Sequence, residues 1–286
     1  MWKQWKVEAH RLAHRGLEQQ NVLKLALPDL RKRALRPVAE VVVGITSYPA
    51  RIEFAWRTIE TLLRQDVRPA AVVLVLAEAD FPGRRVPHRI VSQQRRGLEV
   101  LWVQSNGHSF DKLLPVRAAF PDSAIVTVDD DLYFPSYLIS ELVDATALFP
   151  GHIIGARGWR VHLSKEDGKV HFGTDWERAV KGDSGSGLHL PGGNGCLYPA
   201  GSLDPAVDDL ALALSLVPTN DDIWFWIHGV RAGTKFACLG MAPHSRVTPQ
   251  TKTEALSRRN QHGQEEQFQN ILNYFAIPAD SLRWVD

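Results

Sequence analysis

The segment AIVTVDDDLYFP, residues 124–135, places three consecutive carboxylates directly after five mostly β-branched residues. The apolar run predicts a buried strand, so Asp129, Asp130 and Asp131 would lie at its carboxyl end. Adjacent carboxylates repel one another and lose hydration on burial, which is costly unless a cation lies among them. A divalent metal ion is therefore expected. An acidic turn that caps the following helix is the alternative.

Other polar side chains are expected near the same end of the sheet. Thr46 ends the predicted first strand, and Ser47 and Arg51 follow it. The three residues offer hydroxyl, backbone and guanidinium groups that suit a nucleobase or a phosphate. Glu78 follows the second strand and is placed to accept a hydrogen bond from a base or a ribose. Lys112, ahead of the fourth strand, carries a charge that would neutralise a diphosphate. A surface charge without a ligand is the alternative for each charged residue.

A glycine-rich segment, LPGGNGCLYP, is expected to border a second substrate. Gly192, Gly193 and Asn194 lie within it. Glycines permit close approaches that side chains would block, and this suits a wall beside a sugar. A plain flexible loop is the alternative.

An acidic pair follows in TNDDIWFWIHG. Asp221 and Asp222 stand at a predicted helix start. Carboxylates at such a position also cap helices and interact favourably with the helix dipole. A catalytic role and a capping role therefore both remain open on the pattern alone.

Strands are predicted to alternate with helices over the first half of the chain. The expected strands are 40–46, 71–77, 99–104 and 124–128, and the expected helices are 50–65, 110–120 and 136–149. Less regular strands are expected in 152–163, 169–173 and 234–240, a loop in 181–195, and helices in 204–216, 220–233 and 263–275. This order implies a mostly parallel sheet, whose ligands bind beyond the carboxyl ends of the strands. The three aspartates lie at such an end.

Composition is that of an ordinary globular protein, with a formal net charge of +1 over 286 residues. The near-neutral balance gives no reason to expect nucleic-acid binding. Two distant cysteines, Cys196 and Cys238, favour buried thiols over a disulfide framework or a zinc cluster. Neither a membrane-spanning run nor a secretory signal is evident, so a cytoplasmic location is expected.

The N-terminal segment, residues 1–36, is basic and predicted to be helical. It carries nine Lys or Arg against three Asp or Glu, a local net charge of +6, together with Trp2 and Trp5. Such a segment can lie on an anionic membrane surface, giving peripheral contact with the inner face of the cell membrane. A solvated helix packed on the domain edge is the alternative.

Five motifs occur in an order that resembles a GT-A glycosyltransferase, particularly the bacterial enzymes that build surface polysaccharides. They are VVVGITSYPARI, IVTVDDD, GGNG, NDD and PHS. The resemblance covers about residues 40–250. It implies a single α/β domain, 37–286, with a Rossmann-like nucleotide-binding half at 37–135 around a mostly parallel central sheet and an irregular acceptor-binding half at 136–286.

In the family that this chain resembles, a DxD motif holds Mn²⁺ or Mg²⁺ against the diphosphate of a sugar nucleotide. A hard dication prefers oxygen ligands and stabilises charge on the leaving diphosphate. The resemblance implies that Asp131 ligates the metal, that Asp129 is its partner or contacts the ribose, and that His244 adds a ligand. Alternation along an extended segment would point Asp129 and Asp131 to one side and Asp130 to the other.

Similar enzymes also use an acidic pair, usually Glu-Asp, whose last member deprotonates the acceptor hydroxyl. The resemblance gives this role to Asp222 and a positioning role to Asp221, although this chain has Asp-Asp. The expected reaction is inverting, metal-dependent transfer of a sugar, with a UDP-sugar as donor and a glycan or lipid-linked saccharide of a capsule or lipopolysaccharide as acceptor.

Two other functions fit the same pattern less well. A sugar-phosphate nucleotidyltransferase would carry a glycine-rich phosphate loop after the first strand, and SYPARIEF has no glycine. A non-catalytic carbohydrate-binding member of the fold would fail to bind a nucleotide sugar with metal.

Overall fold

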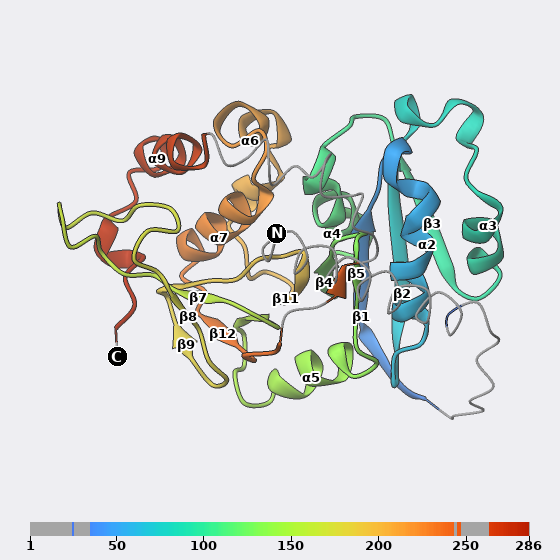
Figure 1. The fold of residues 1–286 in the computed structure, drawn as a ribbon, viewed down its shortest axis with the longest axis horizontal. Helices are drawn as coiled ribbons and strands as arrows, with labels where there is room; N and C mark the ends of the chain where they lie inside the picture. The colour runs from blue at the N-terminus through green and yellow to red at the C-terminus, as the bar shows by residue number, and fades with distance from the viewer. Residues whose placement is uncertain (1–24, 26–34, 243–244, 247–262, 286) are drawn as a thin grey trace, which may run out of the picture.

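The computed structural model describes residues 25, 35–242, 245–246 and 263–285. Its centre is a mixed sheet (Figure 1) in which β1 (Arg36–Thr46) runs parallel to β2 (Val67–Ala77) on one side and to β4 (Ala124–Val128) on the other. β3 (Leu98–Val103) extends the sheet in parallel beyond β2. These parallel pairings confirm the expected α/β fold with a mostly parallel sheet.

The sheet continues beyond β4 with a change of direction. β11 (Asn194–Tyr198) lies antiparallel between β4 and β6 (Ile153–Gly155). β12 (Phe236–Cys238) is parallel to β6, and β9 (Ser184–Gly185) closes the order β3-β2-β1-β4-β11-β6-β12-β9. The glycine-rich segment therefore enters the sheet beside the strand that carries the aspartates.

Both faces of the central strands are buried, which explains their continuous apolar sequences. Val42 packs into one core layer, whereas its neighbours Val41 and Val43 pack into the other. This alternation is the period of a strand.

Helices cover both faces of the sheet (Figure 1). One core layer includes residues of α2 (Pro49–Leu63), α3 (His88–Gln94) and α5 (Leu138–Ala145). The other includes residues of α4 (Leu114–Ala119), α6 (Leu210–Leu216), α7 (Asp221–Arg231) and α9 (Gln264–Tyr274). The described residues also form short 3₁₀ turns: η1 (Glu78–Asp80), η2 (Pro82–Arg84), η3 (His108–Lys112), η4 (Pro205–Asp208) and, after α9, η6 (Ala279–Ser281).

Two smaller sheets flank the main one. β7 (Trp159–Arg160) lies between β8 (Glu177–Arg178) and β10 (Leu188–His189). β5 (Leu132–Tyr133) pairs with β13 (Ser245–Arg246). The pairing brings the segment next to His244 alongside the chain that follows the aspartates.

Several elements differ from their predictions. The helix expected over 110–120 is divided into η3 and α4, because Pro115 lacks an N–H and occupies the first turn of a new helix. The strand expected at 169–173 is absent among the described residues, where Gly168 and Gly173 both adopt a φ of 71° in a turn. The loop expected at 181–195 contains the short strands β9 and β10.

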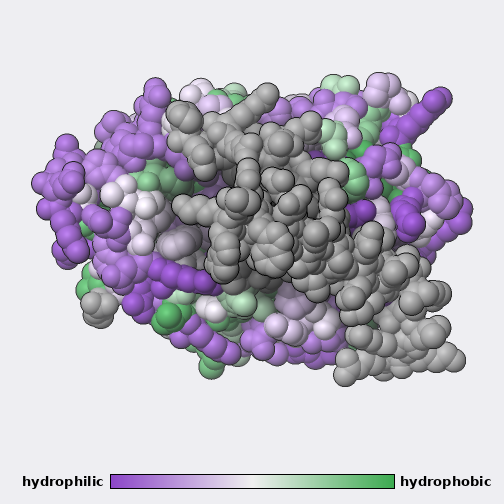
Figure 2. All heavy atoms as spheres, viewed as in Figure 1, coloured by the Kyte–Doolittle hydropathy of each residue, from purple (hydrophilic) through white to green (hydrophobic). Residues whose placement is uncertain are grey.

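The predicted basic helix over residues 1–36 lies outside the described residues, apart from Leu25, Leu35 and Arg36. Arg36 itself opens β1. Of the helices that the structure describes, none has the length and apolar character required to cross a membrane. On the face in Figure 2, hydrophilic residues predominate outside the grey segments, with hydrophobic residues interspersed.

Candidate active site

The three aspartates do not alternate as an extended strand would. Asp130 is buried and accepts hydrogen bonds from Ser47 Oγ at 2.6 Å and Arg51 Nη1 at 2.7 Å. Asp131 Oδ2 accepts from Arg51 Nη2 at 2.5 Å. β4 ends at Val128 and a turn follows at 130–131, so the expected alternation is wrong: Asp130 and Asp131 share the guanidinium of Arg51, and Asp130 does not face away from Asp131.

Burial and the charged neighbours act in opposite directions on the pKa of Asp130. Burial raises it, while Arg51 and the hydroxyl of Ser47 lower it, and the pKa settles at about 6. Burial also lowers the pKa of Arg51, but Asp130 and Asp131 outweigh it and raise that pKa. Arg51 therefore remains a cation that holds two carboxylates together.

Asp129 points to a different cation, Lys112. The Lys112 ammonium is 2.7 Å from Asp129 Oδ1 and 3.0 Å from Asp221 Oδ2, and its side chain is only 3% exposed. Burial alone would lower the pKa of Lys112, but Asp129 and Asp221 raise it well above its usual value. The lysine predicted to neutralise a diphosphate thus bridges the two acidic motifs.

Gly44, in the middle of β1, permits this position of Lys112. A Cβ on Gly44 would lie 2.0 Å from the backbone oxygen of Lys112. Any side chain at that position would push η3 away from the sheet. The glycine in VVVGIT therefore places the lysine.

The glycine turn closes the site from the other side. The N–H of Gly192 donates to Asp222 Oδ1 at 2.8 Å. The carbonyl of Gly193 accepts from the Asp129 N–H at 2.9 Å. Together with Lys112, these contacts form a closed ring, defined by Asp129, Lys112, Asp221, Asp222, Gly192 and Gly193, which we call the acidic ring.

The acidic pair of α7 does not cap its helix through side chains. Asn220 is the N-cap and accepts from the N–H of Ile223 at 3.2 Å. Asp221 and Asp222 are directed to Lys112 and to Gly192 instead. Side-chain capping by this pair is therefore wrong, although both carboxylates lie in the first turn of α7, where they interact favourably with the helix dipole.

Asp222 has a raised pKa. Burial raises this pKa, the adjacent Asp221 raises it further, and it reaches about 7. A carboxyl group poised near neutral pH suits a general base or acid.

The remaining predicted residues occupy varied positions. Thr46 Oγ1 donates to the carbonyl of Val75 at 3.0 Å, within the sheet. Glu78 forms an ion pair with Arg84. Asn194 Oδ1 accepts from Arg157 at 3.2 Å, and His244 lies outside the described residues.

Asp80, Asn106 and Asp111, which follow β2 and β3, were not predicted as site residues. Asn106 Nδ2 donates to Asp80 Oδ2 at 2.7 Å, and the buried Asp111 accepts from the N–H of Gly107 at 3.1 Å. Burial raises the pKa of Asp111 to about 6. Their position after parallel strands was the signal that could have identified them.

The charge of the cluster suits a divalent cation. Five carboxylates, Asp129, Asp130, Asp131, Asp221 and Asp222, face two cations, Arg51 and Lys112. No set of three His, Cys, Asp or Glu side chains in the described part of the chain is arranged to hold a metal. Asp129 and Asp131 supply oxygen ligands of the right chemistry, and the others would come from a diphosphate or from His244.

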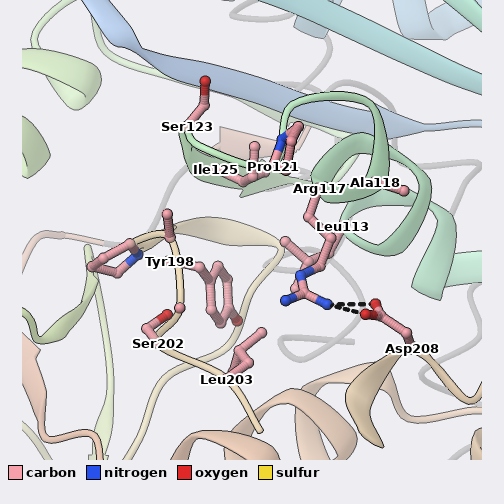
Figure 3. Close-up of a pocket in the computed structure, with 13 residues that line it drawn as sticks. Leu113, Arg117, Ala118, Pro121, Ser123, Ile125, Tyr198, Ser202, Leu203 and Asp208 are labelled. Atoms are coloured by element: carbon pink, nitrogen blue, oxygen red, sulfur yellow. Dashed lines mark hydrogen bonds and ion pairs between the residues drawn. The ribbon is translucent and has the colours of Figure 1, made fainter. Parts of the chain in front are cut away.

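A cavity of about 220 Å³ (Figure 3) lies at the other end of β4, away from the three aspartates. It is lined where β4 begins and β11 ends, by Ile125 and Tyr198 among others. Arg117 points toward Asp208, with which it forms an ion pair at 2.5 Å. Since its guanidinium is already neutralised, the cavity presents no unpaired charge to a ligand.

No protein-family model matches the sequence, and no curated protein matches it. Among solved structures, the chain is similar to S. aureus TarS 1–349 in complex with UDP, with 12% identity and a TM-score of 0.46 over 72% of this chain. The complex of TarS with UDP-GlcNAc gives 12% and 0.45. The chain spans 59% of TarS 1–349 in the UDP complex and 57% in the UDP-GlcNAc complex.

Another similar structure is 4-diphosphocytidyl-2C-methyl-D-erythritol synthase from Anaerococcus prevotii. It shares 13% identity with a TM-score of 0.45, covering 78% of this chain and 99% of that one.

Proposed function

We propose that the chain is a glycosyltransferase that moves a sugar from a nucleotide-diphosphate sugar, with UDP as the nucleotide, to a glycan acceptor of a bacterial surface polysaccharide. The observation that carries the proposal is the acidic ring, which joins the aspartates after β4 to the acidic pair of α7. A donor-side carboxylate and a candidate base thus belong to one rigid arrangement.

The proposed roles follow from the geometry and from the resemblance of the motifs. Asp131 and Asp129, with His244, would hold Mn²⁺ or Mg²⁺. That ion, when bound, stabilises negative charge on the leaving diphosphate. Ser47 and Arg51 hold Asp130 and Asp131 in place at the donor side.

Asp222 is the proposed general base. As the acceptor hydroxyl forms a bond to the anomeric carbon, Asp222 takes its proton, and the bond from that carbon to the diphosphate oxygen breaks with its electron pair leaving on the diphosphate. Attack from the face opposite the diphosphate inverts the anomeric configuration. Asp221, held by Lys112, keeps the start of α7 in position.

Calorimetry of UDP binding with and without Mn²⁺ tests the donor assignment. Metal and nucleotide should each strengthen the binding of the other, because the metal bridges carboxylate and phosphate. Equal UDP affinity in EDTA would remove the metal from the proposal.

A substrate panel distinguishes glycosyl transfer from nucleotidyl transfer. One group contains UDP-sugars, from which a glycosyltransferase releases free UDP. The second group contains nucleoside triphosphates together with sugar phosphates. Pyrophosphate release in the second group would favour a nucleotidyltransferase.

A further inference from the structure

Arg157 lies beside the glycine turn of the acidic ring. Its Nη1 donates to Asn194 Oδ1 at 3.2 Å. The two glycines that precede Asn194 bind Asp222 and Asp129. Three consecutive residues of one turn therefore contact the proposed base, a donor-side aspartate and this guanidinium, so Arg157 borders the turn that holds the proposed base.

Arg178 is a second guanidinium on the same side. It stands opposite Trp159 in the antiparallel pair of β7 and β8, and the N–H of Ala179 donates to the carbonyl of Gly158 at 3.0 Å, which extends the pairing toward Arg157. Burial lowers the pKa of Arg157, and the charge of Arg178 lowers it further. The two like charges are therefore close enough to repel each other.

Neither guanidinium forms an ion pair within the described residues. Arg178 reaches only the carbonyl of Met241, at 3.2 Å, and Arg157 Nε is buried without a hydrogen-bond partner. Arg160, on β7, shows the contrast, because its guanidinium donates to both carboxylate oxygens of Asp183 at 2.7 Å. Within the described residues their guanidinium N–H groups meet only carbonyl oxygens, so both guanidiniums remain available to an oxyanion, which such groups bind through charge-assisted hydrogen bonds.

We propose that Arg157 and Arg178 bind an oxyanion, a phosphate or a carboxylate, carried by the acceptor. The inference rests on the proposed function and names its acceptor class: a phosphate- or carboxylate-bearing glycan or polyol. The donor diphosphate is assigned to the metal ion proposed at Asp129 and Asp131, whereas Arg157 contacts Asn194, on the other side of the glycine turn. Trp159, 37% exposed and opposite Arg178, offers an apolar face for a sugar ring.

The test is titration of UDP-free and UDP-loaded protein with four probes: glycerol 3-phosphate, glucuronate, and their neutral counterparts glycerol and glucose. At least one anionic probe should bind in both forms, and the neutral probes should bind at least about 10-fold more weakly. Arg157→Gln and Arg178→Gln should each weaken anion binding by about 10-fold or more while UDP affinity is kept. Arg95→Gln, an exposed arginine after α3, is the matched control and should change neither.

Several outcomes would overturn the proposal. Equal anion affinity in the wild type and in the Arg157→Gln, Arg178→Gln double variant would show that these arginines do not bind the anion. Loss of UDP affinity in these variants, without anion binding to the UDP-loaded protein, would assign the arginines to the donor and leave the proposed function standing. Failure of the wild type to bind UDP would instead contradict the proposed function. Titration of the UDP-free protein with the anionic probes would still test whether Arg157 and Arg178 bind an oxyanion. If Arg157→Gln fails to fold, Arg157→Lys, which keeps the charge, should retain anion binding and Arg178→Gln should lose it.

Discussion

The carboxylate of Asp222 accepts a hydrogen bond of 2.8 Å from the backbone N–H of Gly192, so the acidic pair of α7 is fixed against the glycine turn rather than against its own helix. This contact gives the carboxylate one defined orientation.

Asp222→Asn should keep UDP affinity and lower turnover by on the order of 10²–10⁴-fold, the usual contribution of a positioned base. The amide oxygen can still accept from the Gly192 N–H, so the turn should survive. Initial rates and UDP calorimetry on the same sample separate the two effects. Near-normal turnover, or retention of the donor's anomeric configuration by NMR of the product, would exclude Asp222 as the base of an inverting reaction.

The pH dependence of kcat/KM should show an acidic limb near pH 7. The pKa of Asp222 is raised to about 7, and a base acts only when deprotonated, so activity should rise as pH increases through this value. The measurement is a rate profile from pH 5.5 to 9 at constant ionic strength. A limb that persists unchanged in Asp222→Asn would belong to another group.

Lys112→Met should destabilise the protein by about 3 kcal/mol, because it leaves Asp129 and Asp221 without their shared cation. The loss should be smaller when Asp221→Asn is present as well, since one of the unpaired charges is then absent. Denaturant unfolding of the two single variants and the double variant provides the cycle. Additive losses would mean that the ammonium does not couple these carboxylates.

Gly193→Ala should displace Asp129 and reduce turnover, because the new Cβ would lie 2.0 Å from Asp129 Oδ2. Gly185→Ala is the matched control: its Cβ would meet only Trp284 at 3.6 Å, an ordinary contact. The two variants should fold alike by circular dichroism and differ in rate. Equal rates would show that the Asp129 position is not needed.

Asp111→Asn should stabilise the protein at neutral pH by about 2 kcal/mol. The pKa of Asp111 is raised by burial to about 6, above its unfolded value, so the folded state binds this proton more tightly. Ionisation of Asp111 therefore does not lower the free energy of unfolding below about pH 4. It lowers it progressively between about pH 4 and 6, and has its full effect above that range. Unfolding at pH 4 and pH 7.5 checks this sign: the variant should gain only at the higher pH.

The strand-helix order of the first half could be predicted because its signals are local. Apolar runs such as VVVGIT and VVLVLA specify strands that are buried on both faces. The antiparallel insertion of β11 could not be predicted, because its partners, β4 and β6, are chosen by contacts far apart in the chain. The same reason applies to the short strands β7 to β10.

At the site, residue types were more predictable than their partners. Asp129, Asp222 and Gly193 were identified from sequence, and the structure brings them together. Lys112 was expected to face a diphosphate, yet it bridges two carboxylates. Its backbone packs against Gly44 and its side chain is buried, so the ammonium pairs with Asp129 and Asp221. Arg157 has no motif around it, so only the tertiary structure shows its position.

The insertion of β11 beside β4 also determines how the chain can be divided. β11 supplies the hydrogen-bonding partner along one side of β4, as β1 does along the other. A fragment that ends at residue 135 would expose that side of β4 as an open strand edge, a template for intermolecular pairing. The residues that form the donor side should consequently aggregate when expressed without the later half, and co-expression of the two halves should restore a paired edge.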